Sequence, residues 1–89
     1  MADLDVTVID MAGARREEVT LPNDAESVQI VAKLVEVMQM PLHSPDGAPM
    51  SYVFHHVETG RQINDSSTLA QAGVSNGDTL RLMAQIVAG

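Results

Sequence analysis

The longest regular pattern in the sequence is an apolar stripe at helical spacing within residues 23–38. Its members recur at intervals of three and four and are Val28, Val31, Val35 and Met38, with Leu34 beside them. Asn23 can cap the start of this helix, and Glu26 three residues later completes a capping-box pattern. Several members of the stripe are β-branched, so packing rather than propensity must stabilise a helix of roughly four turns. The helix therefore needs a second layer against which to bury its stripe.

The segment before this helix has the pattern of a β-hairpin. Residues 4–10 alternate between apolar and polar side chains, which predicts a strand covered on one side. Residues 11–14 form the expected tip, where Gly13 can take positive φ, and residues 15–21 return as the second strand. The side chains expected to point inward are Leu4, Val6, Val8, Val19 and Leu21.

The segment after the helix begins with an irregular loop and continues as a strand. Residues 41–49 contain three prolines and consist of turn-forming residues throughout. Residues 51–57 alternate, with Tyr52 and Phe54 on the face expected to be buried. Val57 has the opposite parity, so either a bulge precedes it or it lies on the surface.

The last third of the chain predicts two more strands separated by turns. Residues 62–64 suit a very short edge strand, and residues 66–73 suit a cap, one helical turn and a glycine stop. Residues 79–84 form the final strand. Its inward residues are Leu80 and Leu82, and its outward residues are Arg81 and Met83. The order of elements predicts an α+β domain, with the helix on one face of a sheet and the final strand parallel to the first.

Composition excludes several classes of partner and compartment. The chain has 12 acidic and 5 basic residues and a net charge of −7, which argues against binding the nucleic-acid backbone. No apolar run approaches the roughly 18 residues of a membrane span. The acidic start, with Asp3 and Asp5, does not resemble a secretory signal, and the chain has no cysteine. We expect a cytoplasmic protein that binds neither nucleic acid nor membrane.

The sequence offers no constellation for catalysis or for a cofactor. No nucleophile motif surrounds its serines and histidines, so we expect no enzymatic activity. His55 and His56 are adjacent in a predicted strand and point to opposite faces, so they cannot chelate one ion together. His43 lies in the irregular loop without an identifiable partner. The histidines are therefore expected to be structural or solvated, and no metal site is predicted.

Two stretches of the chain resemble ubiquitin. Residues 60–69, read as Gly-Arg-Gln-Ile-Asn-Asp-Ser-Ser-Thr-Leu, match ubiquitin's Gly-Lys-Gln-Leu-Glu-Asp-Gly-Arg-Thr-Leu without a gap. In the same register, residues 79–82 fall on ubiquitin's Thr-Leu-His-Leu and Gly89 falls on its terminal glycine. The resemblance implies a ubiquitin-like β-grasp fold, a mixed sheet of four to five strands packed on one long helix. It also implies a domain at residues 1–84 and a flexible tail at residues 85–89.

A second resemblance is to the bacterial YukD-type ubiquitin-like domains of type VII secretion. It is carried by Tyr52-Val53-Phe54 and by residues 68–82, with Ala72-Gly73-Val74 through Gly77-Asp78 closer to these domains than to ubiquitin. Such proteins usually stop at or soon after the last strand, whereas this chain continues to Gly89. The resemblance therefore implies an alternative function, a binding module that is not conjugated and serves a secretion apparatus.

The ubiquitin resemblance implies a protein modifier as the leading function. An E1-like enzyme would adenylate the Gly89 carboxylate, an E2-like enzyme would pass it to amines of target proteins, and a JAB-type or similar peptidase would remove it. Gln85, Ile86 and Val87 would thread the enzyme channel, and Ala88 replaces the first glycine of the usual pair. A sulfur-carrier role uses the same tail and ranks third, because it normally requires a Gly-Gly end.

The same resemblance implies two further sites. Near ubiquitin's hydrophobic recognition patch fall four residues: Met11, Val57, Arg81 and Met83. Methionines are flexible enough to adapt to a partner, which suits a binding surface. Lys33 is the only lysine of the chain, so it or the N-terminus would supply the amine for any lysine-linked chain.

Overall fold

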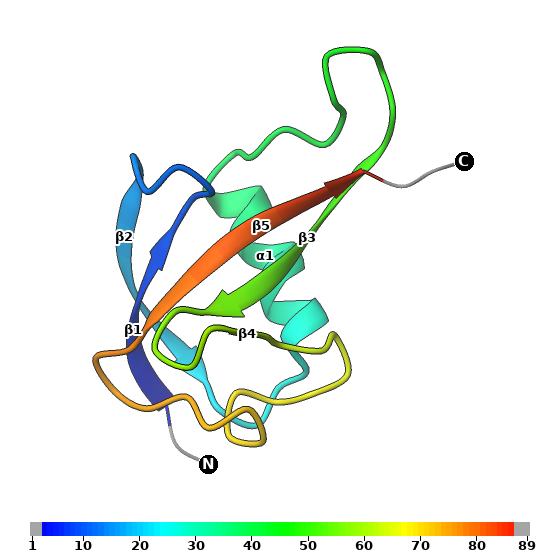
Figure 1. Cartoon of the computed structure of the whole chain (residues 1–89). Helices are drawn as coiled ribbons and strands as arrows, with labels where there is room; N and C mark the ends of the chain where they lie inside the picture. The colour runs from blue at the N-terminus through cyan, green and yellow to red at the C-terminus, as the bar shows by residue number, and fades with distance from the viewer. Residues whose placement is uncertain (1–2, 87–89) are drawn as a thin grey trace.

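The computed structural model describes residues 3–86, which form a five-stranded mixed sheet with one helix on one face (Figure 1). The strand order is β2-β1-β5-β3-β4. The elements are β1 (Asp3–Ile9), β2 (Arg16–Pro22), α1 (Ser27–Val37), β3 (Met50–His56), β4 (Arg61–Gln62) and β5 (Thr79–Ile86). This is the ubiquitin-like β-grasp arrangement that the sequence predicts. Among residues 3–86, the eleven-residue helix α1 is the longest helical segment, and none spans a membrane.

The last strand of the chain lies at the centre of the sheet. β5 runs parallel to β1, with Val8 opposite Leu80, and antiparallel to β3, with Phe54 opposite Leu82. β1 and β2 pair antiparallel through the predicted hairpin, whose tip residue Gly13 has a φ of 75°. The predicted parallel pairing of the first and final strands is therefore confirmed.

One apolar core fills the space between the sheet and α1. The sheet contributes side chains that alternate along each strand, and Val8, Phe54, Leu80 and Leu82 are each 0% exposed. The helix contributes Ile30, Val31, Leu34, Val35 and Met38, and the loops contribute Ile63, Leu69 and Val74. Burial of this apolar surface is the main force that holds the sheet and the helix together.

The helix differs from its prediction at its first turn. It begins at Ser27 and has about three turns rather than four, and its cap residue Glu26 makes no side-chain capping bond. The Ser27 amide and hydroxyl instead both donate to the Ser67 carbonyl, at 2.8 and 2.7 Å, and the Val28 amide donates to the Asp65 carbonyl at 3.0 Å. A distant loop thus satisfies two of the free N–H groups at the start of the helix, where no side-chain cap forms.

The helix buries four of the five residues predicted for its stripe, and the exception is Val28. Ser27 faces the core at 1% exposure, so Ile30 and Leu34 follow it inward, whereas Val28 is 44% exposed. The prediction that Val28 belongs to the stripe is wrong, because a buried serine starts the stripe and hydrophobicity alone does not reveal it.

The pairing of β3 decides between the two alternatives for Val57, a preceding bulge or a surface position. The register between β3 and β5 is unbroken from Met50 to His56, so no bulge occurs in this pairing. Val57 follows the end of β3 and is 40% exposed. Of the two alternatives, Val57 therefore lies on the surface.

The segment before β5 contains the predicted cap and glycine stop. Thr68 and Gln71 form a reciprocal pair, in which the Gln71 amide donates to the Thr68 hydroxyl at 3.1 Å and the Thr68 amide to the Gln71 side chain at 2.9 Å. The Ala72 amide completes one turn by donating to the Thr68 carbonyl, and Gly73 ends it with a φ of 80°. The predicted edge strand lies slightly earlier, at Arg61–Gln62 rather than residues 62–64.

The final strand is longer than predicted. β5 continues to Ile86, and Gln85 and Ile86 stand opposite Ser51 and Met50 of β3. The expected strand end at residue 84 is thus two residues short, because β3 begins early enough to pair with both. The remaining residues of the predicted tail, 87–89, lie outside the described residues.

The first testable prediction concerns the helix register. Ile30→Ala should lower the free energy of unfolding by about 2–5 kcal/mol, because it removes a buried side chain and leaves a cavity. Val28→Ala in the same turn should change it by less than about 0.5 kcal/mol, because Val28 is exposed. Urea unfolding followed by circular dichroism measures both, and a larger loss for Val28→Ala would contradict the observed register.

Candidate functional site

The face of the sheet opposite α1 is the principal surface that the fold leaves without a covering helix, and we call it the open face (Figure 1). One row of residues crosses it through consecutive strand pairs: Arg16 opposite Ile9, Ile9 opposite Arg81, Arg81 opposite His55, and His55 opposite Gln62. Directly opposed residues point to the same side of a sheet. Arg81 is therefore at the centre of a row with mixed basic and apolar character.

The next row toward the end of β5 is apolar. Val53 stands opposite Met83, and both have the parity of Arg81 rather than that of the core residues. Val53 is only 6% exposed although it is not part of the core cluster, so neighbouring side chains on the open face cover it. Ile9, Val53 and Met83 thus form a small apolar area beside Arg81.

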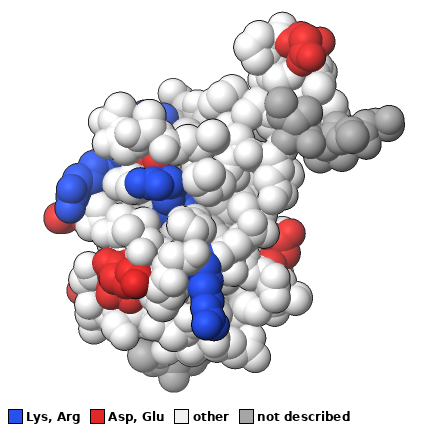
Figure 2. All heavy atoms as spheres, viewed as in Figure 1, with Lys and Arg blue, Asp and Glu red and all other residues white. Residues whose placement is uncertain are grey.

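The opposite end of the open face is acidic. Asp5 and Glu18 line a shallow hollow of about 400 Å³ together with Thr7, Thr20 and Gly77. The Thr20 hydroxyl donates to Asp5 at 2.7 Å, which fixes one of these carboxylates. The open face therefore changes along β1 and β5 from an acidic end, through the arginine row, to an apolar end. Figure 2 shows basic side chains near the centre of this view with uncharged atoms between them.

The four residues of the predicted recognition patch are distributed along the length of β5: two belong to the strand, and the other two contact it from outside. The Val57 amide donates to the Thr79 carbonyl at 3.1 Å, which places Val57 at the start of the strand. Arg81 and Met83 follow on the open face and are half-buried. Met11 lies at the far end, where its sulfur accepts the Ala84 N–H at 3.3 Å. Arg81 and Met83 share the open face, Met11 contacts the same strand at Ala84, and Val57 lies beside the start of the strand. The role of the four residues in binding stays a prediction.

The position of Met11 has a structural reason. Pairing between β1 and β5 ends at Ile9 and Arg81, so the Ala84 N–H faces the side from which β1 has departed. The Met11 sulfur covers this N–H while the side chain stays 50% exposed. Met11 thus shields part of the edge of β5 that β1 no longer pairs with, and its exposed side chain offers a flexible apolar surface.

Arg81 has an unsatisfied donor. Within residues 3–86, its Nε is a buried nitrogen that has no hydrogen-bond acceptor. A buried donor without an acceptor costs about 1–3 kcal/mol, and more when the group is charged. Protein atoms cover this Nε, so a partner would meet only the exposed part of the half-buried Arg81 side chain.

The residues predicted for conjugation divide into two sets. Gln85 is exposed and, like Ile86, pairs with β3, so these two residues belong to the sheet and not to a free tail. Val87, Ala88 and Gly89 lie outside the described residues. Their predicted roles in activation and threading stay predictions.

Lys33 lies on the opposite side of the molecule from the open face. It is exposed on α1 and lines a groove of about 450 Å³ between α1 and β2. The other walls of this groove are mainly apolar, with contributions from Leu21, Ile30 and Val37. The Lys33 amine is therefore accessible, as a linkage site requires, and its use as one stays a prediction.

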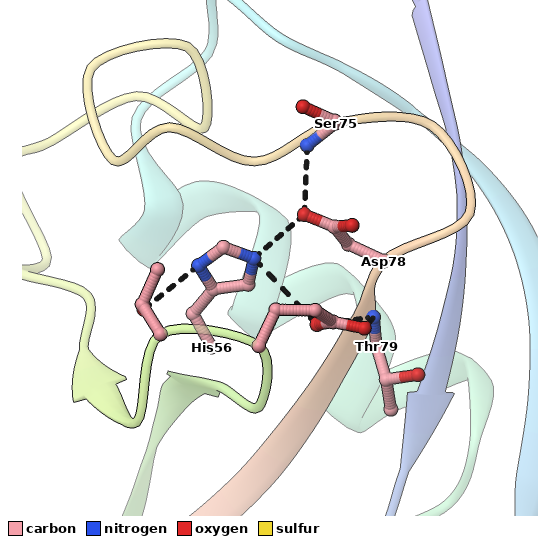
Figure 3. A network of polar contacts seen from close by, with 6 residues as sticks. His56, Ser75, Asp78 and Thr79 are labelled. Atoms are coloured by element: carbon pink, nitrogen blue, oxygen red, sulfur yellow. Dashed lines mark hydrogen bonds and ion pairs between the residues drawn. The ribbon is translucent and has the colours of Figure 1, made fainter.

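A separate polar network surrounds His56, on the buried side of the sheet (Figure 3). Its Nε2 lies 2.7 Å from Asp78 Oδ2, and its Nδ1 lies 3.0 Å from the Thr59 hydroxyl. The Asp78 carboxylate also accepts the Ser75 N–H at 3.0 Å. The Ser75 N–H, and after it the His56 ring, hold the pKa of Asp78 below its usual range. The network ties the end of β3 to the loop that leads into β5.

Sequence reasoning missed this network because its members are far apart along the chain. His56 and Asp78 are separated by 22 positions, and their contact depends on the path of the intervening loop. The pattern showed only that His55 and His56 point to opposite faces, which the structure confirms: His55 is half-buried and His56 is 2% exposed. No local spacing could have joined His56 to Asp78.

The second prediction concerns Asp78 and pH. Because its pKa is lower in the folded state than in the unfolded state, its contribution to stability is present above the unfolded pKa of about 4 and is lost as the pH falls through the folded value. Asp78→Asn should lower the free energy of unfolding at pH 7 by about 1–3 kcal/mol, and the deficit should shrink below pH 4.

Urea unfolding of both proteins between pH 7 and pH 2.5 measures this effect. Asp24→Asn, at an exposed carboxylate before α1, is the matched control and should change stability by less than about 0.5 kcal/mol. A deficit for Asp78→Asn that is the same at every pH would show that the charge of Asp78 does not stabilise the fold.

Comparisons with known proteins agree with this architecture. The family model described as "WXG100 protein secretion system (Wss), protein YukD" matches residues 4–82. The ubiquitin-like domain of EccD5 from Mycobacterium xenopi is similar in structure, with a TM-score of 0.75 and 18% identity, over 99% of this chain and 100% of that one. Ubiquitin from Caldiarchaeum subterraneum gives a TM-score of 0.65 and 22% identity, over 99% of this chain and 100% of that one. No curated protein sequence matches the chain.

The two solved structures share less than a quarter of their residues with this chain, so they establish the fold alone. The family model covers both sheet halves and the helix, from β1 to the inward residues of β5. The chain therefore belongs to the YukD family of ubiquitin-like proteins.

Proposed function

We propose that this chain is a non-catalytic protein-binding module that serves a WXG100-type secretion system and contacts its partner through the open face. The observation that carries this proposal is the match of the YukD family model over residues 4–82, which includes β2, β3, β4, nearly all of β1 and the first half of β5. The proposed place of action is the cytoplasm. Its reducing conditions suit a chain that has no cysteine and so does not depend on disulfides.

The physical chemistry of the open face supports a protein partner. The half-buried Ile9 and Met83 provide an apolar centre, and Arg81 beside them provides a charged anchor. Interfaces commonly combine a desolvated apolar centre with arginine, which is enriched among the residues that contribute most binding energy. The positive charge of Arg81, whose side chain is half-buried, favours a partner that presents a carboxylate or carbonyl oxygen at this point.

A second candidate function is protein modification through Gly89. Its support is the gapless register of residues 60–69 and 79–82 with ubiquitin, in which Gly89 falls on the terminal glycine. The partners would be an E1-like enzyme, an E2-like enzyme, a JAB-type or similar peptidase and target proteins. A sulfur-carrier function would use the same carboxylate and ranks below, because Ala88 precedes Gly89 where a second glycine is usual.

The strand β5 weighs against the modifier function. Threading through an enzyme channel needs an extended segment without partners, whereas Gln85 and Ile86 pair with Ser51 and Met50. Their use in threading would require the end of the β3–β5 ladder to open first. A binding module needs no such opening, because the open face is already formed.

The third prediction tests the open face. Arg81→Ala should weaken binding to the secretion-system component that recognises this chain by at least tenfold, which is about 1.4 kcal/mol, because it removes the charged anchor. Met83→Ser should also weaken binding. Val37→Ala, at an exposed position of α1 on the other face, should leave the affinity within twofold.

Isothermal titration calorimetry with each purified soluble component of the secretion system measures these affinities. Far-ultraviolet circular dichroism checks that each variant is folded. If no component binds the wild-type chain, or if Arg81→Ala and Met83→Ser bind as tightly as the wild type, the proposed function is wrong.

The fourth prediction separates the two candidate functions. Removal of Gly89 should leave binding through the open face unchanged, because Gly89 follows the last described strand. For a modifier, the same deletion should abolish every adduct formed with ATP, an E1-like enzyme and lysate, and Lys33→Arg should abolish lysine-linked chains. Mass spectrometry of the products decides, and a Gly89-dependent adduct would favour the modifier function.

A further inference from the structure

We propose that His56, Glu58 and Asp78 form a binding site for a divalent transition metal, and that Zn²⁺ is the ion that suits it. The site lies where β3 ends and β5 begins, on the side of the sheet away from the open face (Figure 3). It is a different site from the one in the proposed function and does not depend on that function.

The three ligand atoms already converge. His56, Glu58 and Asp78 each offer one ligand atom, and these three atoms lie within 4.8 Å of one another. Nε2 lies 2.7 Å from Asp78 Oδ2 and 3.7 Å from Glu58 Oε1. Tetrahedral Zn²⁺ with bonds of about 2.0–2.2 Å holds its ligand atoms roughly 3.3–3.5 Å apart. The His56–Asp78 separation must therefore widen and the His56–Glu58 separation close, each by less than an ångström, and the Glu58–Asp78 separation, which is at most 4.8 Å, must close by at most about 1.5 Å.

Each ligand is also held by an outer partner. The Thr59 hydroxyl lies 3.0 Å from His56 Nδ1, on the side of the ring away from the carboxylates. The Ser75 N–H donates to Asp78, and the Thr79 N–H donates to both oxygens of Glu58 at 2.9 and 3.1 Å. Metal-binding histidines and carboxylates are typically fixed in this way, which distinguishes the cluster from a chance gathering of acidic groups.

The burial of the three side chains suits a site that an ion can enter from solvent. The His56 side chain is 2% exposed, that of Asp78 19% and that of Glu58 43%. The imidazole is therefore enclosed by the protein, whereas both carboxylates are accessible to solvent. Glu58 is the most exposed of the three, so its side chain can move to close its own separations, whereas Asp78 must move to widen its distance from the buried His56. A solvent molecule can supply a fourth ligand on the exposed side.

The donor set selects among metals. One imidazole nitrogen and two carboxylate oxygens suit Zn²⁺ and similar transition ions. Ca²⁺ requires six to eight oxygen ligands, and Mg²⁺ requires near-octahedral oxygen coordination. We therefore expect neither of these two ions to compete at comparable concentration.

Binding of the ion requires the Nε2 lone pair of His56 to be free. A neutral imidazole satisfies both observed contacts when Nε2–H donates to Asp78 and Nδ1 accepts from the Thr59 hydroxyl. When the metal takes the Nε2 lone pair, the single ring proton resides on Nδ1 and donates to the Thr59 oxygen.

The bound ion would fasten the loop before β5 to the end of β3. This loop also holds β1, because the Asp5 amide donates to the Asn76 side chain at 2.9 Å and the Gly77 amide donates to the Asp5 carbonyl at 2.7 Å. An ion at the site would therefore connect the ends of three neighbouring strands. Because the site exists only in the folded chain, the ion should raise the midpoint of thermal unfolding.

The test is titration of the chelator-treated protein with ZnCl₂ at pH 7.5, followed by calorimetry and thermal unfolding. We expect saturable binding of one ion per chain and a higher unfolding midpoint, and no shift with Mg²⁺ or Ca²⁺ at the same concentration. Glu58→Gln should reduce the affinity at least tenfold. This variant keeps an oxygen that accepts the Thr79 N–H, so the fold is preserved. Asp78→Asn should reduce the affinity similarly.

The other two histidines provide matched controls. His43→Gln and His55→Gln should keep the affinity within twofold, because neither residue is part of the cluster. In spectra of ¹⁵N-labelled protein, Zn²⁺ should shift the Nε2 signal of His56. The proposal is overturned if Zn²⁺ does not bind, if Glu58→Gln binds it as well as the wild type, or if a control variant abolishes binding.

Discussion

The structure depends on β5 and on its alternation between two faces. This strand pairs with β1 on one side and with β3 on the other, so it joins the N-terminal hairpin to the second half of the chain. Its even-numbered residues Leu80 and Leu82 are fully buried, and its odd-numbered residues Arg81 and Met83 lie on the open face. A shift of the register by one residue would expose two leucines and bury an arginine, which the core could not tolerate. The packing of the core therefore also fixes the composition of the open face.

This coupling explains which parts of the site the sequence could predict. Alternation is a local property, so it correctly placed Leu80 and Leu82 inward and Arg81 outward. Parity alone could not place Val57, because the answer depends on where β3 stops pairing with β5. Contacts between distant segments were beyond a local pattern altogether. Met11 reaches Ala84 across 73 positions, and His56 reaches Asp78 across 22.

The helix start shows the same limit in the fold. A capping box is a local device, and its residue types are present at the expected spacing, yet the segment around Ser67 satisfies the helix amides instead. Ser27 and Ser67 are 40 positions apart, and the bond buries a hydroxyl that a hydrophobic pattern counts as exposed. Where tertiary contacts supply the hydrogen bonds of a helix terminus, its boundaries and its buried stripe depend on the whole fold. A strong local pattern then predicts that a helix forms, but it does not determine where the helix begins or which residues it buries.

The length of β5 is set by its neighbour and not by its own sequence. Tyr52 donates its hydroxyl to the Pro41 carbonyl at 2.7 Å, and the Met50 amide donates to the Leu42 carbonyl at 2.9 Å. These bonds hold the start of β3 against the preceding loop, so that Met50 and Ser51 are in place to pair with Ile86 and Gln85. The loop of residues 41–49 thus decides how far the last strand stays in the sheet. The loop thereby also bears on the two candidate functions. Binding through the open face uses β5 as it is paired, whereas conjugation requires the end of β5 to separate from β3.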